Sequence, residues 1–323
     1  PLNITDARSQ TTSFNYDNNA NVVGTVYPNG GLESYTNDAR GEVVAVKNRR
    51  GQAITFVRDN FGRVTHKATA EGRTFDYAYD ARGFGRSPDR GVWGGRELMT
   101  EDLRTAINVA RQMYPDAELV VVGDSMGSAE AIALFGGPNP PHVDRLILTA
   151  PAVWGWSTMP PAYSLALWFS AHTFPWQPVQ PPRGVVRHIT PSDNIDMLRH
   201  IGQDRNMLFT TRIDAVYGLV NLMETASRRT AALQGDVAFL YGAKDQIIPH
   251  ASAIAAARRL PAHARTAVYA HGYHMLIRDH ERELVYADIL SFIEAPNAPF
   301  PSGAPPLIPA HEPAPTATAQ ANR

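Results

Sequence analysis

The stretch Val120-Val-Val-Gly-Asp-Ser-Met-Gly-Ser128 decides how the chain is interpreted. A run of β-branched residues ends in the pattern Gly123-x-Ser125-x-Gly127, and a helix-forming run, residues 129–134, follows at once. This order predicts a strand, a sharp turn and a helix, which is the setting that presents a serine nucleophile. Both glycines are expected to serve a steric purpose, because strand and helix must pass closely. The alternative is a glycine-rich turn with a capping serine.

A serine nucleophile needs two partners elsewhere in the chain. A base must take its proton, and a third group must orient that base. In a sheet of this kind the acid and then the histidine follow on loops after later strands. Asp245 follows the strand expected at 237–241, and we take it as the acid rather than as a turn carboxylate. His271 and His274 follow the next expected strand, and position favours His274 only weakly. The two histidines lack an accompanying carboxylate pattern, so we expect no metal site.

Composition excludes several classes of protein. The 323 residues contain no cysteine, which excludes disulfides and thiolate chemistry. A formal net charge of -1 provides no electrostatic basis for a nucleic-acid partner. No apolar run reaches the roughly 18 residues of a membrane span, and no signal pattern opens the chain, so we favour a cytoplasmic location and leave the oligomeric state open. Gly83-Phe-Gly85 lacks the third glycine of a dinucleotide loop, and we expect no cofactor.

Residues 1 to about 80 form an internal repeat. Its aspartates and glycines recur every 21 residues, at Asp17, Asp38, Asp59 and Asp80 and at Gly30, Gly51 and Gly72. Each unit alternates polar with apolar or aromatic residues, breaks at a glycine and alternates again, which predicts one β-hairpin per repeat. Such a hairpin cannot bury its apolar face alone, so we expect the hairpins to stack.

From about residue 75 to 295 strands alternate with helices, which predicts a doubly wound, mostly parallel α/β sheet. The expected strands are residues 75–79, 119–122, 145–150, 237–241 and 266–269, and the expected helices 97–113, 252–260 and 281–294. Residues 152–230 interrupt this order with prolines and four of the five tryptophans. We interpret this insertion either as a helical lid over an apolar pocket or as ordinary packing. The Pro/Ala-rich residues 296–323 are expected to be disordered.

Two family resemblances follow from these motifs. Tyr16-Asp17 and Tyr79-Asp-Ala-Arg-Gly83 resemble YD (Rhs-type) repeats, which implies a hairpin segment over residues 1–74. Gly123-Asp-Ser-Met-Gly127, Leu240-Tyr-Gly-Ala-Lys-Asp245 and His271-Gly-Tyr-His-Met-Leu276 resemble the α/β-hydrolase superfamily, most of all monoacylglycerol lipase and lysophospholipase-like enzymes. This second resemblance covers residues 75–295. It implies Ser125 as nucleophile, His274 as base, Asp245 as acid and the backbone N–H of Met126 as an oxyanion donor.

The same resemblance predicts a missing part. In these hydrolases a strand ending in His-Gly precedes the segment matching residues 75–79, and its following loop supplies a second oxyanion donor. Repeats occupy that place here, so the sheet must close the gap, borrow a repeat strand or stay open. Losing one donor lowers turnover by about 10²–10³.

We therefore expect an impaired serine hydrolase of fatty-acyl carboxylic esters, such as monoacylglycerols or lysophospholipids. Its substrate is a small molecule or a lipid, and its lid is a candidate for peripheral membrane contact. The alternative is a catalytically inactive fusion in which the repeats act as a binding or display module.

Overall fold

The computed structural model of the chain describes residues 2–58, 64–70, 74–76, 80–87, 89–180 and 189–308. The chain divides into two compact units. The repeat unit comprises residues 1–79 and 105–116, and the α/β unit comprises residues 80–104 and 117–323. Helix α1 (Arg96–Met113) contributes to both units, so one boundary between them falls inside a helix rather than in a linker.

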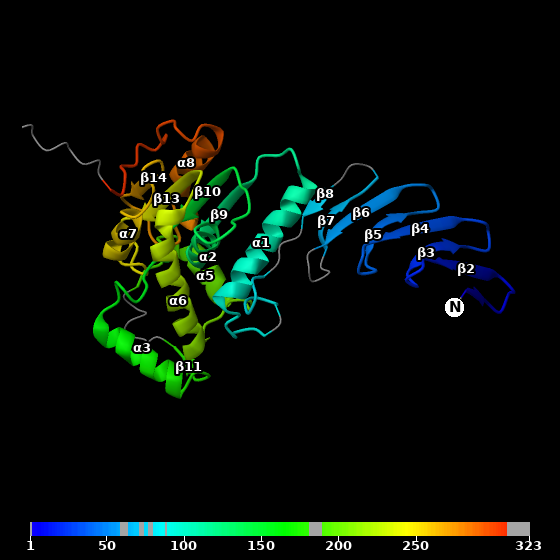
Figure 1. Cartoon of the computed structure of the whole chain (residues 1–323), viewed down its shortest axis with the longest axis horizontal. Coiled ribbons are helices and arrows are strands. Elements are labelled where there is room, and N and C mark those ends of the chain that lie inside the picture. The colour runs from blue at the N-terminus through cyan, green and yellow to red at the C-terminus, as the bar shows by residue number, and fades with distance from the viewer. Residues whose placement is uncertain are drawn as a thin grey trace, which may run out of the picture. The chain divides into compact units, whose positions relative to one another are not determined.

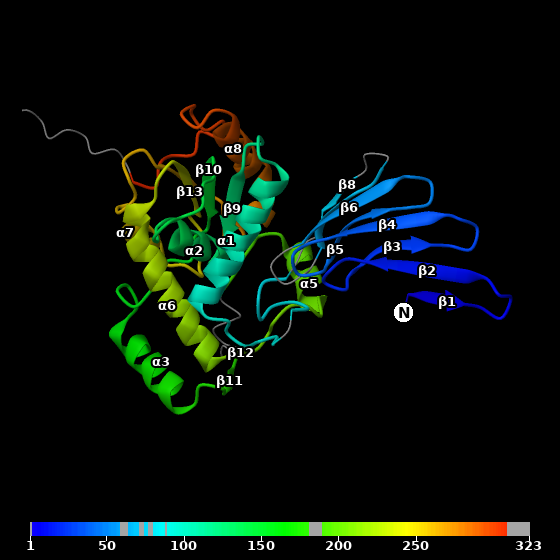
Figure 2. The same ribbon diagram turned by 45° about the vertical axis from the view of Figure 1, so that its right-hand side comes forward.

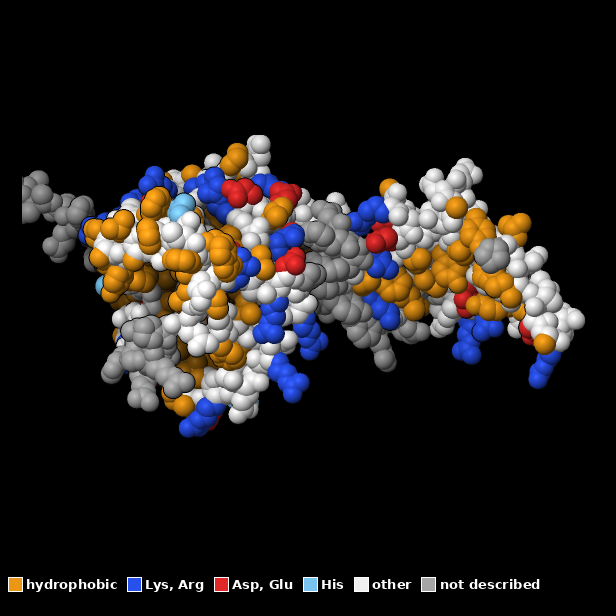
Figure 3. Space-filling model, turned by 90° about the horizontal axis from the view of Figure 1, so that it is seen from below, with side chains coloured by type: hydrophobic (Ala, Val, Ile, Leu, Met, Phe, Trp, Pro, Cys, Tyr) orange, Lys and Arg blue, Asp and Glu red, His pale blue; other side chains and the backbone are white. Residues whose placement is uncertain are grey.

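The repeat unit is an antiparallel sheet in which each strand pairs with its neighbours in sequence (Figure 1). Its eight described strands are β1 (Asn3–Thr5), β2 (Thr11–Tyr16), β3 (Val22–Val26), β4 (Leu32–Asn37), β5 (Val43–Lys47), β6 (Ala53–Arg58), β7 (Val64–Ala68) and β8 (Thr74–Asp76). Stacked hairpins are therefore what the repeats form, as their alternating pattern predicts. A band of hydrophobic side chains runs along the face of this sheet seen in Figure 3.

The turns between these strands explain the 21-residue period. Asp17 Oδ1 accepts hydrogen bonds from the backbone N–H groups two and four residues later, at 2.9 and 2.8 Å. Asp38 repeats this arrangement at 2.9 and 3.0 Å. A short side-chain acceptor of this kind closes a turn in place of a backbone carbonyl. Asp6 and Asn48 make the same pair of bonds, so the turn recurs at about half the period that the aspartates alone display.

The α/β unit is built on a parallel sheet whose described strands lie in the order β14-β13-β10-β9 (Figure 1), and Figure 2 shows β13, β10 and β9 from another side. The strands are β9 (Val120–Asp124), β10 (Arg145–Thr149), β13 (Asp236–Gly242) and β14 (Arg265–Tyr269). β10 and β13 are buried along almost their whole length, as interior parallel strands are. β9 is the last strand in this order, and Val122 is 49% exposed. Among the described residues the sheet therefore stays open beside β9.

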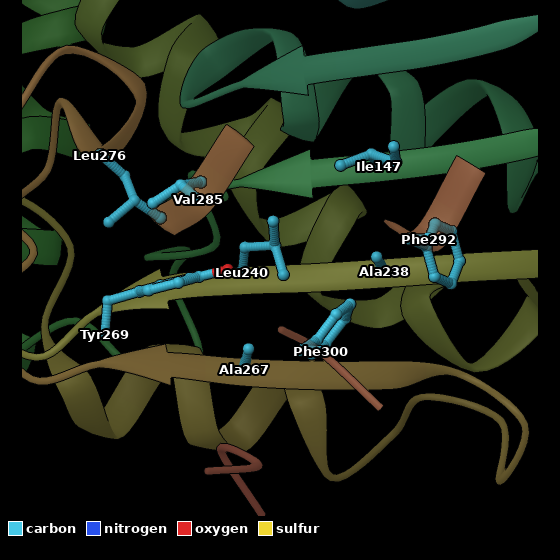
Figure 4. Close-up of a cluster of buried hydrophobic side chains, with 9 residues drawn as sticks. All are labelled: Ile147, Ala238, Leu240, Ala267, Tyr269, Leu276, Val285, Phe292 and Phe300. Carbon is cyan, nitrogen blue, oxygen red and sulfur yellow. The ribbon is translucent and has the colours of Figure 1, made fainter. Parts of the chain in front are cut away.

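Helices cover the two faces of this sheet. One core cluster joins alternate strand residues to α8 (Arg282–Glu294), and it consists of Ile147, Ala238, Leu240, Ala267, Tyr269, Leu276, Val285, Phe292 and Phe300. Figure 4 shows these side chains on one face of the sheet, with other helices behind it. The remaining helices include α2 (Met126–Phe135), α6 (Ile213–Arg229) and α7 (His250–Ala257), and α2 packs against α6. Short 3₁₀ turns occupy η1 (Thr230–Ala232) and η2 (Leu276–Arg278).

The strand expected at residues 75–79 does not belong to the parallel sheet. Its described part lies in β8, which pairs antiparallel with β7 in the repeat unit. Residues 77–79 lie outside the described residues. The expectation of a parallel strand is wrong for residues 75 and 76, because an alternating sequence suits a repeat hairpin as well as a sheet strand.

The insertion at residues 152–230 has a packed part and an exposed part. α6 buries Leu222, Met223 and Ala226, so it belongs to the core. α3 (Pro161–Thr173) has no buried residue, and its Leu165, Trp168 and Phe169 are 68%, 50% and 57% exposed. The other described elements of the segment are α5 (Ile195–Gln203), β11 (Pro178–Val179) and β12 (Thr211–Arg212). α6 is therefore an ordinary packed helix of the core, whereas α3 is an apolar helix that is exposed to solvent.

The first part of the segment expected to be disordered is packed instead. Phe300 and Leu307 are 8% and 5% exposed. The fully buried Asp288 accepts hydrogen bonds from the Ser302 backbone N–H at 2.9 Å and from the Tyr269 hydroxyl at 2.8 Å. The expectation is wrong for residues 296–308, because two large apolar side chains and one buried carboxylate hold them; residues 309–323 lie outside the described residues. No helix in the described part of the chain is long and apolar enough to cross a membrane.

Candidate active site

The turn after β9 holds Ser125 in an unusual backbone conformation. Its φ of 51° and ψ of -112° fall outside the regions that residues with a Cβ ordinarily adopt. The Ser125 N–H donates to the Thr149 carbonyl at 2.9 Å, and the Ser125 carbonyl accepts from the Ala152 N–H at 3.1 Å. Strain of this kind persists only where the surrounding structure fixes it, and it concentrates at functional sites.

Only one of the two motif glycines has a steric reason in the structure. A Cβ on Gly123 would lie 2.7 Å from the Ser128 Cα, so the strand passes too close to α2 for any side chain. A Cβ on Gly127 would meet no atom within 4 Å. The expectation for Gly127 is therefore wrong. The close approach at Gly123 is reinforced by the buried Ser128, whose hydroxyl donates to the Gly123 carbonyl at 2.8 Å.

The structure brings Ser125, His274 and Asp245 together from three different loops. Ser125 Oγ lies 2.8 Å from His274 Nε2, and His274 Nδ1 lies 2.8 Å from Asp245 Oδ2. The other carboxylate oxygen of Asp245 accepts from the backbone N–H groups of Ile247 and Ile248 at 2.8 and 2.9 Å. The side chains of His274 and Asp245 are 8% and 0% exposed. The Asp245 carboxylate is therefore fixed by its own loop and directed at the imidazole of His274.

The loops that carry Asp245 and His274 contact each other closely. A Cβ on Gly242 would lie 2.5 Å from the carbonyl oxygens of both Gly272 and Tyr273, so the end of β13 tolerates no side chain here. The Lys244 N–H donates to the Gly272 carbonyl at 2.9 Å. His271, the other histidine of this loop, is exposed and lies outside the chain of hydrogen bonds. The hydrogen bonds thus single out His274, whereas the positions of His271 and His274 in the sequence distinguished them only weakly.

Two acidic residues lie close to Ser125 in the sequence, and one of them, Glu130, is not predicted from the sequence as part of the site. The Asp124 carboxylate accepts a hydrogen bond from the Thr149 hydroxyl at 2.7 Å, which anchors the residue directly before the serine. Glu130 is half-buried on α2, and burial, with a smaller contribution from the nearby Asp102 carboxylate, raises its pKa to about 7. The available signal was a single charge within the otherwise apolar run 129–134.

Comparison with known families agrees with this architecture. A family model described as serine aminopeptidase, S33 (Hydrolase_4) matches residues 59–281, which is more than half of the chain. The chain belongs to this α/β-hydrolase family. A model of the RHS repeat matches residues 38–74 of the same hydrolase. The two matches overlap at residues 59–74, where the structure places β7 and the first residue of β8 in the repeat sheet.

The relatives of this hydrolase include lipases. The monoacylglycerol lipase of Mycolicibacterium smegmatis is 27% identical over 251 residues, which cover 73% of this chain and 84% of that protein. The monoacylglycerol lipase of Paleococcus ferrophilus matches with a TM-score of 0.54 and 18% identity over 67% of this chain and 82% of that one. A soluble variant of Saccharomyces cerevisiae monoglyceride lipase matches with a TM-score of 0.56 and 14% identity over 67% and 75% of the two chains. Both predicted family resemblances are thereby confirmed.

Proposed function

We propose that the protein is a serine hydrolase of carboxylic esters in which Ser125 is the nucleophile. The observation that carries the proposal is the continuous chain of two 2.8 Å contacts from Ser125 through His274 to Asp245. His274 Nε2 takes the Ser125 proton as the oxygen attacks the ester carbonyl, and returns it to the departing alcohol. Water, activated by the same imidazole, then releases the acid from the acyl-enzyme. Asp245 holds the ring and stabilises its positive charge.

The proposed reaction develops negative charge on the carbonyl oxygen of the ester. Met126 is the first residue of α2, so its backbone N–H is among those left without a partner inside the helix and is suited to that oxygen. No described strand pairs with the free edge of β9, which is where the resemblance puts the strand leading to a second donor. We propose that turnover is accordingly about 10²–10³ lower than with two donors.

The proposed substrates are fatty-acyl esters of the monoacylglycerol or lysophospholipid type. The names of the relatives support this class. The exposed aromatic and aliphatic side chains of α3 support it independently, because a fatty chain or a lipid aggregate would remove them from water. At about 25 cal/mol per Å² of apolar area, such contact favours substrates with long chains. We also propose that α3 contacts lipid surfaces peripherally.

A series of p-nitrophenyl esters tests the proposed substrate class. The acetate, butyrate, octanoate and palmitate are incubated with the full chain and with Ser125→Ala in parallel, and 1-monooleoylglycerol serves as the natural-type ester. We expect kcat/KM to rise from acetate to octanoate and the variant to show no turnover above background. A preference for acetate would exclude the fatty-acyl assignment, and a failure to hydrolyse any ester would exclude the esterase assignment.

A further inference from the structure

A short segment connects the insertion to the loops of both the acid and the base. We call it the strap, residues 190–194, and it leads directly into α5. Thr190 N–H donates to the side chain of Gln246, the residue after Asp245, at 2.7 Å. The carbonyl of Pro191 accepts from the N–H of Met275, the residue after His274, at 2.9 Å. Five consecutive residues are therefore tied to the two loops that complete the catalytic group.

The other strap residues bind the far end of the histidine loop. Asp193 Oδ1 accepts from the His280 backbone N–H at 2.9 Å, and Asn194 Nδ2 donates to the Arg278 carbonyl at 3.1 Å. Asn194 also caps α5, because its Oδ1 accepts from the Met197 N–H at 3.1 Å. The strap thus fixes the start of α5 and the end of the histidine loop with the same residues.

The centre of this contact is a buried hydrogen bond between Ser192 and Asp279. The two residues are 0% and 2% exposed, and Ser192 Oγ donates to Asp279 Oδ1 at 2.6 Å. The second carboxylate oxygen of Asp279 accepts from the backbone N–H of Tyr273 at 2.7 Å. Tyr273 directly precedes His274. One carboxylate therefore joins the strap to the peptide unit that leads into the histidine.

Burying the charged carboxylate of Asp279 is energetically unfavourable. Burial raises the pKa of its carboxyl group, whereas the hydrogen bonds from the Ser192 hydroxyl and the Tyr273 N–H act in the opposite direction. Removing the carboxylate would leave both of these donors buried without an acceptor, which is more costly than never having made the bonds. The Asp279 carboxylate accepts a hydrogen bond at each oxygen, so it is suited to fixing the backbone at Tyr273 relative to Ser192.

We propose that Asp279 is a positioning residue for His274, holding the imidazole within reach of Ser125 through the Tyr273 N–H and linking this geometry to the insertion through Ser192. The inference rests on the proposed function of the three residues. Displacement of a catalytic group by about 1 Å typically lowers the rate by about 10²-fold. Asp279 touches neither the ester nor the reacting atoms, so its effect reaches the chemistry only through His274.

The test compares two buried aspartates of the same unit. Asp288 is the matched control, because it is 0% exposed and holds Tyr269 and Ser302 rather than the strap. Asp279→Ala, Asp279→Asn and Asp288→Ala are made in the full chain, and kcat and KM are measured on p-nitrophenyl butyrate. We expect Asp279→Ala to lower kcat by about 10–100-fold with KM within about twofold. Asp279→Asn recovers most of this loss, because its oxygen still accepts from Tyr273. Asp288→Ala lowers the melting temperature and leaves kcat within about twofold.

Two outcomes would overturn the inference. One is a kcat of Asp279→Ala within about twofold of wild type, and the other is an equal loss of kcat in Asp279→Ala and Asp288→Ala. If Asp279→Ala does not fold, Ser192→Ala replaces it. Ser192→Ala removes only the link to the strap, so a several-fold loss of kcat in this variant supports the inference, and a kcat within about twofold of wild type overturns it.

A second readout separates this inference from the proposed function. The proton between His274 Nδ1 and Asp245 is followed as a low-field ¹H NMR signal and assigned by its loss in His274→Ala. We expect Asp279→Ala, or Ser192→Ala in its place, to shift this signal or broaden it by exchange, while Asp279→Asn and Asp288→Ala leave it nearly unchanged. If the wild type hydrolyses no ester, the proposed function fails, and the NMR signal alone tests the positioning role. An unchanged signal in Asp279→Ala, or in Ser192→Ala in its place, would then contradict that role.

Discussion

The hydrogen bonds that shape the repeat unit join residues close in sequence, whereas those that assemble the candidate site in the α/β unit join residues far apart. In the repeat unit, Asp17 and Asp38 bond backbone groups no more than four residues away. In the α/β unit, Ser125 meets His274 across 149 residues, and His274 meets Asp245 across 29. The repeat unit uses the same short-range turn several times, whereas the α/β unit assembles one site from separate loops. Substitutions should therefore have local effects in the repeat unit and long-range effects in the α/β unit.

The units can be measured separately because all five tryptophans lie in the α/β unit, at positions 93, 154, 156, 168 and 176. Tryptophan fluorescence consequently follows unfolding of the α/β unit. The strand signal in far-ultraviolet circular dichroism includes the repeat sheet as well. A substitution in one unit can therefore be assigned to that unit by comparing the two signals.

Asp245→Asn should produce the largest loss. An amide would present N–H to His274 Nδ1 and favour the wrong tautomer, which lowers ester hydrolysis by about 10³–10⁴ while the tryptophan transition changes little. The control is Asp236→Asn, because Asp236 makes a partly exposed ion pair with Arg145 at 3.2 Å. Hydrolysis should stay near wild type in the control. More than a tenth of wild-type activity in Asp245→Asn would contradict its proposed role.

Gly123→Ala and Gly127→Ala should differ although both alter the same motif. The new methyl group at Gly123 would meet backbone atoms of Ser128, so we expect a loss of about 3 kcal/mol in unfolding free energy. At Gly127 nothing lies within 4 Å, and the better helix propensity of alanine predicts a gain of up to about 1 kcal/mol. Urea unfolding followed by tryptophan fluorescence measures both. Equal losses would contradict the close approach at Gly123.

Glu130→Gln should change how stability depends on pH. The pKa of Glu130 is raised to about 7, so between the unfolded value near 4.5 and 7 the folded state binds more protons. Stability therefore falls as pH rises through this window and is level above it. We expect Glu130→Gln to gain about 2 kcal/mol relative to wild type between pH 5 and pH 8. Urea unfolding of both proteins at pH 5 and at pH 8 measures this change. A difference in unfolding free energy between variant and wild type that does not depend on pH would show that Glu130 does not titrate in this range.

Asp38→Ala should have the smallest and most local effect. Two backbone N–H groups lose their side-chain acceptor, which lowers the stability of the repeat sheet near this turn. Thermal unfolding by circular dichroism should register this loss, while Asp38→Asn retains the acceptor and stays close to wild type. A larger shift in the tryptophan transition than in the circular dichroism transition would break the distinction between the two units.

The contrast also explains what could be predicted from the sequence. Hairpins and turn residues follow from patterns of two to four residues, so the repeat sheet was predictable. The strands β10, β13 and β14 followed from apolar runs, and Ser125 and Asp245 followed from the strands that precede them. The choice of His274 over His271 came from the family resemblance, because position alone favoured it only weakly. Three features could not be obtained this way. The membership of β8 depends on which strand lies beside it, the packing of residues 296–308 depends on the distant Asp288, and the buried pair Ser192–Asp279 joins positions with no motif between them.

The central claim is that Ser125 is an activated nucleophile, and a fluorophosphonate probe tests it most directly. The full chain and Ser125→Ala are incubated with the probe, digested, and analysed by mass spectrometry. We predict one covalent adduct per chain, on the peptide that contains Ser125, and none in the variant. Folded wild-type protein that remains unlabelled, or labelling that persists in Ser125→Ala, would contradict the claim.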